Sequence, residues 1–370
     1  MQAPGVRVYL DWNATAPPLD EVILAMADIS KRAWANPSSV HGEGRRARAV
    51  VEDARAFVGE LAGVDPRDVT FTSSATEANN LALTSALAAR EGAIVTSRLE
   101  HPSITKVAER HASRARWVRA LPDGLIDLED LSRALSEGPV AVVALGAVNQ
   151  ETGVIQPLRE VMRMAQTVGA WLHVDAAQAW GKLAVDLDRV ASACVAPHKF
   201  RGPKGIGALV TAPHVKLSPL LVGGSQEKGV RPGTVDPSLA AGLGVAARHA
   251  TSGPSRYEAV REHRDRLEAA LVELGGQVNG SAPRAPHVTS VAFSKWHGPE
   301  LVAALDLEGV ACSSGSACSA GTADPSPVLV AMHDATRASS SVRLSMGETT
   351  TSADVQSALE AFARVLSRLM

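Results

Sequence analysis

The segment Trp171-Leu172-His173-Val174-Asp175-Ala176-Ala177-Gln178 places a carboxylate at the point where an apolar run gives way to small residues. The run predicts a buried strand over Trp171–Val174, with Asp175 at its carboxyl end. Short runs of this kind alternate along the chain with amphipathic stretches. That alternation predicts crossover connections and a mostly parallel sheet with helices on both faces, so the expected fold class is α/β.

The expected strands of this sheet are short and apolar: Val69–Ser73, Ala93–Ser97, Arg116–Ala120, Val140–Ala147, Trp171–Val174, Cys194–Ala196 and Ile206–Val210. The expected helices are Asp20–Trp34, Thr76–Arg90, Pro102–His111, Leu128–Leu135 and Pro157–Val168. Ligands on such sheets bind at the carboxyl ends of the strands. Polar residues of chemical interest follow several of these strands directly.

The pattern changes near residues 252–256, where Gly and Pro interrupt it. After this point we expect a smaller α+β domain, with a long charged helix first and then strands and helices in mixed order. Its expected elements are Arg256–Leu274, Val288–Ser294, Glu300–Leu307, Val310–Ser313, Val342–Met346 and Ala353–Leu369. The predicted division is a large domain over 15–252 and a small domain over 1–14 and 253–370.

The composition excludes several classes of protein. The 370 residues carry a formal net charge of −2, so nothing indicates binding to nucleic acid or to a membrane surface. Three cysteines in so long a chain do not form a disulfide framework, and a reducing cytoplasm is expected. We expect no secretory signal in Met1–Pro18, and the longest apolar run, Val140–Val148, is too short to span a bilayer.

Lys199 ends the segment Val195-Ala196-Pro197-His198-Lys199 and opens a glycine-rich loop. A lysine in a dry pocket beside other cations has a lowered pKa and can form an imine; an ordinary solvated lysine is the alternative. Asp175 would be costly to bury unpaired. A protonated ring nitrogen would compensate it, and a simple turn cap is the alternative.

The segment Thr72-Ser73-Ser74-Ala75-Thr76-Glu77 follows a strand and opens a helix, with capping-box spacing between Ser74 and Glu77. The free N–H groups of a helix start, here at Ala75 and Thr76, receive a phosphate well. An ordinary capped helix explains the same residues. His101 precedes the next helix, where it could stack on a flat ring and carry protons, or be a simple loop histidine.

Cys318 lies in the run Ser313-Ser314-Gly315-Ser316-Ala317-Cys318-Ser319-Ala320-Gly321, which predicts a mobile loop that carries a thiol. Cys312 is expected in the core, and its spacing to Cys318 does not favour zinc. Arg343 is on a predicted strand. Facing inward it would clamp a carboxylate, but the strand pattern alone favours an outward, solvated arginine.

Together these motifs resemble those of cysteine desulfurases of the NifS/IscS type, which are fold-type I pyridoxal phosphate (PLP) enzymes of the class V aminotransferase branch. The resemblance covers nearly the whole chain. The segments that carry it are Tyr9–Pro17, Asn36–His41, Thr72–Asn80, Glu100-His101, Val148–Gly153, Val174–Gln178, His198-Lys199, Arg231–Thr234, Ser313–Ser319 and Ser341–Gly347.

The resemblance implies that the protein converts L-cysteine to L-alanine and leaves the sulfur on Cys318 as a persulfide. A sulfur-acceptor protein of iron–sulfur assembly or thiolation would then receive that sulfur. Lys199 would hold PLP and move the substrate proton, with His101 as a proton shuttle. The implied cofactor-binding residues are Lys199, Ala75, Thr76, His101, Gln150, Asp175, Gln178, His198 and Thr234. Asn149 and Arg343 are the implied substrate-binding residues.

Thr234 is expected to reach the phosphate of a neighbouring subunit, which implies a homodimer. Two positions depart from the family pattern. Gln150 stands where an asparagine is common, and Ala196 stands where a serine is common. The loss of one hydrogen bond to a charged group costs roughly 1.5–3 kcal/mol, so we expect weaker binding of PLP. The alternative functions are a selenocysteine lyase, another PLP-dependent aminotransferase or lyase, and a non-catalytic sulfur carrier.

Overall fold

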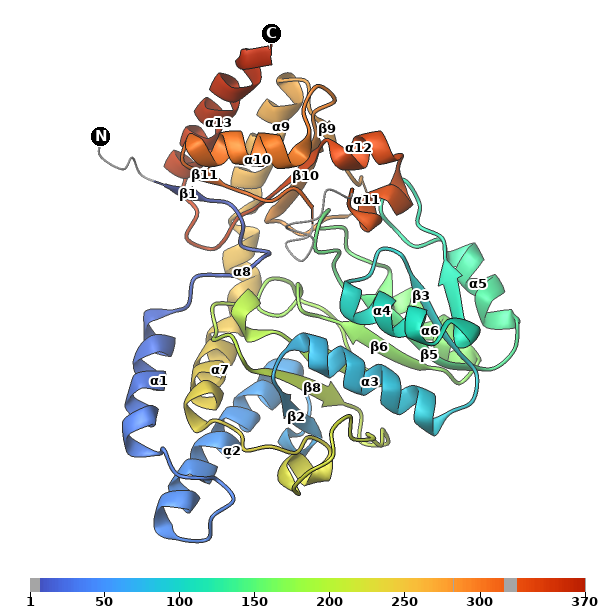
Figure 1. The fold of residues 1–370 in the computed structure, drawn as a ribbon, viewed down its shortest axis with the longest axis vertical. Coiled ribbons are helices and arrows are strands. Elements are labelled where there is room, and N and C mark those ends of the chain that lie inside the picture. Colours follow the sequence, from blue (N-terminus) through green and yellow to red (C-terminus); the bar gives the residue numbers. More distant parts are fainter. Residues whose placement is uncertain (1–6, 282, 316–324, 370) are drawn as a thin grey trace.

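The computed structural model describes residues 7–281, 283–315 and 325–369. Its central feature is a sheet of seven strands in the order β2-β8-β7-β6-β5-β3-β4 (Figure 1). The strands are β2 (Val69–Thr72), β3 (Ala93–Ser97), β4 (Ala115–Val118), β5 (Val140–Gly146), β6 (Trp171–Asp175), β7 (Ser192–Val195) and β8 (Gly207–Thr211). The predicted α/β class is confirmed, and the expected strands all form with shifts of one or two residues at their ends.

The strand β8 departs from the parallel arrangement, because it pairs antiparallel with both β7 and β2. The segment between β7 and β8, which the structure describes throughout, holds a single 3-10 turn, Pro197–Lys199, and no crossover helix. Without a crossover helix the chain returns beside β7 in the opposite direction. Lys199 therefore lies in a tight connection directly after a buried strand.

Helices cover both faces of the sheet because its strands alternate apolar side chains between the faces. On β3, Ile94 packs in a cluster with α3 (Ala75–Ala89) and α4 (Pro102–Arg110). The next residue, Val95, belongs to the main cluster on the other face. That face is covered by α2 (Gly42–Ala62), α5 (Leu128–Ser136), α6 (Leu158–Thr167) and α7 (Pro237–Ala250).

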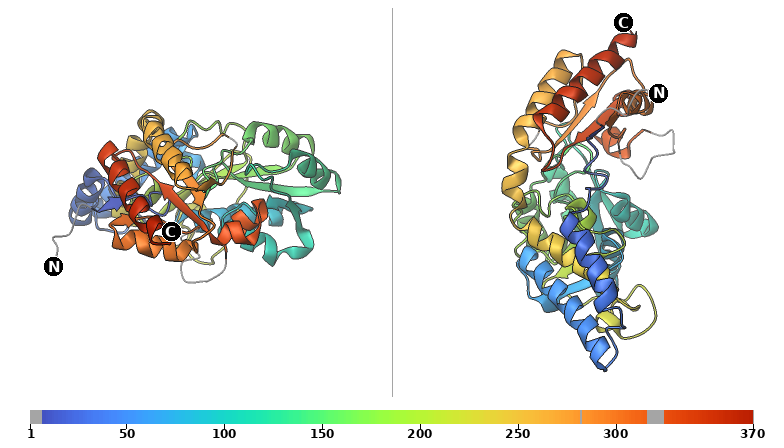
Figure 2. Two further views of the ribbon diagram at one scale, coloured as in Figure 1. Left: turned by 90° about the horizontal axis from the view of Figure 1, so that it is seen from above. Right: turned by 90° about the vertical axis from the view of Figure 1, so that its left-hand side faces the viewer.

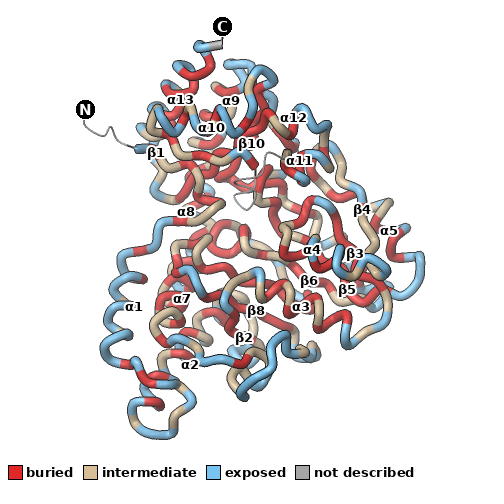
Figure 3. The backbone as a smooth tube through the Cα atoms, viewed as in Figure 1, coloured by how far each residue is buried: buried red, intermediate tan, exposed pale blue. Residues whose placement is uncertain are grey.

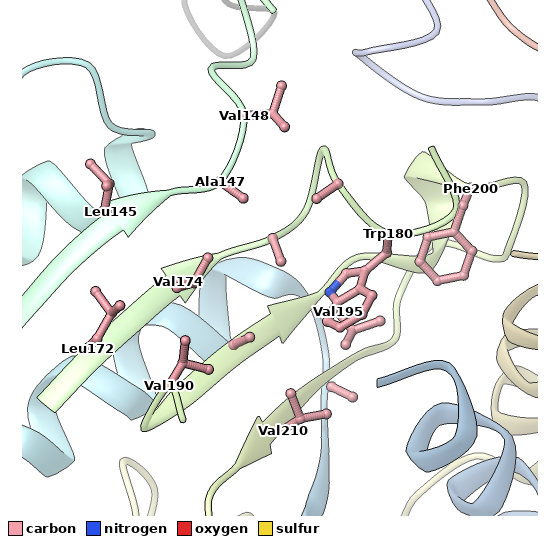
Figure 4. Packing of buried hydrophobic residues seen from close by; sticks show 14 of the residues in the cluster. Leu145, Ala147, Val148, Leu172, Val174, Trp180, Val190, Val195, Phe200 and Val210 are labelled. Carbon is pink, nitrogen blue, oxygen red and sulfur yellow. The ribbon is translucent and has the colours of Figure 1, made fainter. Parts of the chain in front are cut away.

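Apolar packing also fixes the loops beyond the strand ends. Figure 4 shows Trp180 and Phe200 next to each other, beyond the end of β7. The indole N–H of Trp180 donates to the main-chain oxygen of Cys194 at 2.7 Å. The turn after β6 and the Lys199 connection after β7 are therefore packed together, although a whole strand separates them in the chain.

The small domain has its own core. It contains an antiparallel sheet in the order β12-β10-β9 and a parallel pair, β1 with β11. Its strands are β1 (Val8–Tyr9), β9 (Gln277–Val278), β10 (Val288–Ala292), β11 (Val310–Ala311) and β12 (Ser341–Ser345), and its larger helices are α9 (Arg261–Glu273), α10 (Gly298–Leu307) and α13 (Ser352–Leu366). Val8 and Leu10 pack in this core with residues from 260 onward. That packing supports the predicted boundaries at 14–15 and 252–253, which stay a prediction.

The molecule is elongated, with α9, α10 and α13 at one end and α2 and α1 (Asp20–Arg32) at the other (Figures 1 and 2). Figure 3 shows buried chain in both domains and exposed chain along α1 and the outer loops. Among the described residues, no helix is long and apolar enough to cross a membrane.

The predicted helix Arg256–Leu274 is wrong as a single element. The chain forms α8 (Gly253–Glu258) and α9 (Arg261–Glu273), with a break at Ala259 and Val260. The amide of Val260 bonds to the oxygen of Tyr257 at 3.0 Å, which tightens the backbone there. Tyr257 and Val260 are both buried, so the break lets these two apolar side chains of a charged segment point into the protein interior.

Four further helices were not predicted: α2, α7, α11 (Pro327–Met332) and α12 (Ala335–Ser339). The signal for α2 was present, because Ala47, Val51, Ala54 and Val58 are buried at helical spacing within a highly charged segment. The last two helices have five or six residues each. Such short helices carry too little periodicity to be read from sequence.

A partly buried ion cluster joins the two domains close to the Lys199 connection. Glu348, just after β12, accepts hydrogen bonds from Arg201 at 2.7 Å, from His249 at 2.8 Å and from Arg256. Burial raises the pKa of Glu348, but these three partners outweigh it and bring the pKa to about 2. The cluster fixes the exit of β12 relative to α7 and α8.

We expect Glu348→Gln to lower the free energy of unfolding by about 2 kcal/mol at neutral pH, because Arg201 and Arg256 lose their counter-charge. The folded-state pKa is depressed, so this stabilisation is present above the unfolded-state value of about 4.3 and is lost as the pH falls toward the folded value. Urea denaturation of both proteins at several pH values measures the difference. Exposed Glu360→Gln is the control, and an equal loss in the two variants would contradict the role of the cluster.

Candidate active site

A cavity of about 250 Å³ lies where the carboxyl ends of the central strands meet the small domain. Gly146 on β5, Asp175 on β6 and Ala196 after β7 line its floor. The N-terminal segment contributes Asn13 and Ala14, so a stretch far away in sequence closes the site. The position agrees with the rule that parallel sheets bind ligands at the carboxyl ends of their strands.

Lys199 enters this cavity from the connection after β7. Its Nζ donates to the main-chain oxygen of Asn13 at 2.5 Å and to that of Ala14 at 3.0 Å. The amine is therefore held inside the protein by main-chain acceptors and does not point into bulk solvent. This is the placement that a lysine needs if it is to form an imine with a bound aldehyde.

Asp175 faces the cavity from the end of β6 and is held by three donors. Its Oδ2 accepts from Asn79 at 2.7 Å, and its Oδ1 accepts from the amide of Ala177 at 3.0 Å and from the thiol of Cys194 at 3.1 Å. Burial raises the pKa of Asp175, but the positive influence of His101 and these hydrogen bonds outweigh it and leave the pKa below its usual value. The group is thus a carboxylate at neutral pH.

A buried histidine orients the amide that holds Asp175. The Oδ1 of Asn79 bonds to Nε2 of His173 at 2.9 Å, while Nδ1 of His173 bonds to the hydroxyl of Ser192 at 2.8 Å. Burial lowers the pKa of His173 to about 4, despite the nearby charge of Asp175. The ring is therefore neutral at physiological pH and leaves the carboxylate charge uncancelled for a ligand.

His101 lines the same cavity and begins α4 as its N-cap. Its Nδ1 accepts from the amide of Ser103 at 3.1 Å and lies 2.8 Å from the hydroxyl of that residue. The hydroxyl of Ser103 also accepts from Asn79 at 2.8 Å. Because Nδ1 is an acceptor, a neutral His101 carries its proton on Nε2. His101 and Asp175 are thereby connected through Ser103 and Asn79.

The start of α3 forms the polar end of the cavity, lined by Ser74, Ala75 and Thr76. The hydroxyl of Ser74 accepts from the amide of Glu77 at 3.2 Å, as the capping-box spacing predicts. The carboxylate of Glu77 instead bonds to the amide of Ser73 at 2.6 Å. A side chain at Gly207 would lie 2.6 Å from the main chain of Ser74, so only glycine lets β8 pack this closely against the helix start.

His198 lines the cavity beside this helix start, and its Nδ1 lies 3.2 Å from the hydroxyl of Thr15. Burial lowers the pKa of His198 to about 3, and Lys199, Lys204 and Lys182 act in the same direction. Its imidazole is thus neutral at physiological pH. Gln178 also lines the cavity, with its Nε2 donating to the main-chain oxygen of Asn13 at 3.0 Å.

Arg343 faces inward, so the outward placement favoured by the strand pattern is wrong. Its side chain is 2% exposed and lines the cavity. One Nη donates to Asp11 at 2.6 Å and the other to the main-chain oxygen of Gln150 at 3.1 Å, whereas the buried Nε has no hydrogen-bond partner among the described residues. Alternation along β12 does not reveal this, because the whole strand is buried.

Two predicted residues stand apart from the cavity, and a third lies outside the described residues. Asn149 uses its side chain to build the following turn: its Oδ1 accepts from the amides of Glu151 and Thr152, and its Nδ2 donates to Leu99. It is not among the cavity-lining residues, whereas its neighbour Gln150 is.

Thr234 is exposed and also lies outside the lining. Cys318 lies outside the described residues, while Cys312 is buried in the small-domain core as expected.

Sequence reasoning missed Asn79 and Ser103, which connect His101 with Asp175. It also missed Glu100, whose carboxyl group accepts from the amide of Gly146 at 2.5 Å and from Ser97 at 2.9 Å. Burial raises the pKa of Glu100 to about 8. A signal existed for Asn79, because a polar residue on the buried face of an otherwise apolar helix needs a partner.

The residues present fit PLP. The helix start of α3 and neutral His198 suit a phosphate, ionised Asp175 suits a protonated ring nitrogen, and the amine of Lys199 suits the aldehyde. His101 lines the same cavity and has a flat ring suited to stacking on the cofactor. The charges and donors in the cavity thus match an aromatic phosphate ester at both of its ends.

Comparisons with known proteins agree with this fit. The aminotransferase class-V family model matches residues 8–358. The IscS-like cysteine desulfurase of Mycobacterium tuberculosis is 38% identical over 97% of this chain and 96% of its own length. A solved NifS-like protein is 30% identical, with a TM-score of 0.91, and the match covers 98% of this chain and 100% of the solved one.

A structure described as SspA in complex with cysteine is 29% identical, with a TM-score of 0.82 and coverage of 93% and 100% of the two chains. The chain belongs to the class-V aminotransferase family. Within that family it is similar to cysteine desulfurases of the NifS/IscS type, which confirms the resemblance seen in the sequence. The expected fold-type I architecture and PLP as the cofactor are confirmed with it.

We expect Asn79→Ala to weaken the binding of PLP about tenfold to a hundredfold, because Asp175 loses a charged-group hydrogen bond worth roughly 1.5–3 kcal/mol. Titration of the apoprotein with PLP, followed by visible absorption, gives the dissociation constant. Asn80→Ala is the matched control: Asn80 is on the same helix turn, but its amide donates to the main-chain oxygens of Thr76 and Ser103 and not to Asp175. Equal effects of both substitutions would contradict this role of Asn79.

Proposed function

We propose that the protein is a cysteine desulfurase that converts L-cysteine to L-alanine and transfers the sulfur to Cys318. The observation that carries this proposal is the single cavity that holds Lys199, Asp175, His101 and an inward-facing Arg343. The similarity to named cysteine desulfurases and to a protein solved with cysteine supports the choice of substrate.

Substrate binding falls to Arg343 in this proposal. A guanidinium fork recognises a carboxylate in two-point geometry, and Asp11 and the Gln150 main chain already orient the fork. The Nε of Arg343, which has no hydrogen-bond partner in the part of the chain that the structure describes, is a donor for a substrate carboxylate. Gln150 itself lines the cavity beside this group, in keeping with its predicted place next to the cofactor.

PLP supplies an electron sink for the bond that is broken at the substrate Cα. Asp175 keeps its charge in the buried site and favours a protonated ring nitrogen. Lys199 is the base that removes the Cα proton at its Nζ and returns a proton later. His101 holds an exchangeable proton on Nε2, so it is our candidate for moving a proton within the cavity.

The sulfur step requires the thiolate of Cys318, since the thiolate is the nucleophilic form of cysteine. It attacks Sγ of the substrate, forming an S–S bond while the substrate Cβ–Sγ bond breaks. The substrate carbon skeleton takes up a proton and leaves as alanine, so Cys318 retains one added sulfur atom. The role of Cys318 rests on the resemblance and not on geometry.

Other parts of the proposal concern partners and place. We infer a homodimer in which Thr234 contributes to the phosphate site of the neighbouring subunit, and exposure of Thr234 leaves it accessible for that role. The persulfide of Cys318 would pass to an acceptor protein of iron–sulfur assembly or thiolation. The described cysteines, Cys194 and Cys312, are unpaired, in keeping with the reducing cytoplasm that we propose as its location.

The central test is the product of L-cysteine turnover by the purified protein. We expect one alanine for each sulfur released in the presence of a reductant, and a visible absorption band that is lost in Lys199→Ala. Cys318→Ala should keep the band and the affinity for cysteine but form no persulfide. Full alanine production by Cys318→Ala would rule out its role, and a higher rate with selenocysteine or with amino-acid and keto-acid pairs would point to a different reaction.

A second prediction concerns Arg343→Lys, which keeps the charge but loses the planar fork. We expect the KM for L-cysteine to rise about tenfold or more while kcat changes less, because two-point binding of the carboxylate is lost. Steady-state kinetics measure both constants. Arg337→Lys is the control, since Arg337 bonds to Asn279 and the Val278 main chain elsewhere in the small domain. An unchanged KM in Arg343→Lys would refute substrate binding by Arg343.

A further inference from the structure

Lys182 is a buried lysine that the proposed mechanism does not use. It follows β6 and stands four residues after Gln178, in the turn that packs beneath the cavity. Its side chain is 0% exposed, yet Lys182 is not among the residues that line the cavity. Lysine is almost never fully buried unless its amine is paired, so its contacts need an explanation.

Two side-chain oxygens receive the amine of Lys182. Its Nζ donates to Oε1 of Gln178 at 2.8 Å and to Oδ1 of Asn13 at 3.2 Å. The ring of Tyr257 lies 6.0 Å from Nζ and closes the apolar side. Burial lowers the pKa of Lys182 well below its usual value, and Lys199 and Arg343 add to this effect. The two acceptors use two of the N–H groups of this amine.

The contact with Gln178 decides which way its amide faces. Lys182 offers donors, so the oxygen of Gln178 must face Lys182 and the nitrogen must face away. That nitrogen donates to the main-chain oxygen of Asn13 at 3.0 Å. Gln178 lines the cavity, and its amide nitrogen carries a second N–H. In the opposite orientation the amide would present an acceptor there.

The contact with Asn13 acts on Lys199. The side-chain oxygen of Asn13 also accepts from Nε2 of His287 at 3.0 Å, and its main-chain N–H donates to Ser345 at 2.9 Å. These two bonds hold Asn13 from the small domain, and the bonds from Lys182 and Gln178 hold it from the large domain. The main-chain oxygen of the same residue receives the amine of Lys199 at 2.5 Å. Lys182 thus bonds directly to Gln178 and to Asn13, the residue whose main-chain oxygen accepts from Lys199.

We propose that Lys182 is a positioning residue, which holds the Gln178 amide with its nitrogen toward the cavity and holds Asn13 where its main-chain oxygen receives the amine of Lys199. The inference rests on the proposed function, because Gln178 is one of the residues that the family resemblance implies in binding PLP. Lys182 does not line the cavity and acts through Gln178 and Asn13, which do.

A purely structural role makes a different prediction about stability. A lysine whose pKa is lowered by folding reduces stability at every pH below its unfolded-state value of about 10.4. Methionine has a similar length and no charge, so Lys182→Met removes this cost. If Lys182 served only the stability of the fold, a lysine would not be expected at a place where its burial lowers that stability.

The test is a double-mutant cycle on PLP binding with the full-length protein. The four proteins are the wild type, Lys182→Met, Gln178→Ala and the double variant. For each, the dissociation constant and the position of the visible absorption band are measured by titrating apoprotein with PLP. We expect Lys182→Met to weaken binding about fivefold to tenfold and to shift the band in the wild-type background. In the Gln178→Ala background it should do markedly less.

Arg114→Met is the matched control. Arg114 donates to the main-chain oxygens of Gly92, Leu87 and Arg90 at the far ends of the strands. Its loss should lower the melting temperature and leave the band in place. Lys182→Gln retains an amide donor on a shorter chain, so it should restore part of the band position that Lys182→Met loses.

Equal effects of Lys182→Met in both backgrounds, or an unchanged band and affinity, would overturn the positioning role. Failure of both Lys182 variants to fold would also overturn it, because Lys182 would then be a residue of the fold. Failure of the proposed function is separate: it would show as a wild-type protein with no visible band and no alanine production.

Discussion

The whole site depends on a carboxylate that the fold buries at the end of β6. Such a group is costly to remove from water, and the structure compensates it with donors from three directions: the amide of Asn79, the main chain of Ala177 and the thiol of Cys194. The neutral ring of His173 behind Asn79 adds no positive charge. Most of the negative charge of Asp175 therefore stays available to a cationic ring nitrogen.

The sequence was sufficient for the framework and for nine of the 19 residues that line the cavity. Lys199, Asp175, His101, Thr76 and Gln178 were predicted and lie together, since each follows a strand of one sheet and strand ends of a sheet share an edge. What failed depended on three-dimensional context. Because all of β12 is buried, its sequence pattern did not show that Arg343 faces inward. The chain between β7 and β8 has no crossover helix, so β8 runs antiparallel, and residue propensities do not predict the direction of a strand.

The two departures from the family pattern differ in kind. Ala196 lines the cavity as a buried apolar residue, so it offers no hydroxyl to a phosphate. Gln150 also lines it, but its main-chain oxygen has a second role, because it accepts from Nδ2 of Asn13 and from Arg343. The longer side chain at 150 therefore leaves the anchoring of Arg343 intact, because that anchoring uses the backbone. Weaker binding of PLP at Ala196 stays a prediction.

The amine of Lys199 rests on carbonyl groups at positions 13 and 14, and this has an evolutionary consequence. Every amino acid brings a carbonyl, so no point mutation can delete these acceptors. Substitutions in the N-terminal segment can only move these acceptors. The residues that hold this segment in place therefore come under selection instead. The contact with Lys199 thus tolerates substitutions at positions 13 and 14, whereas the residues that hold this segment in place tolerate fewer.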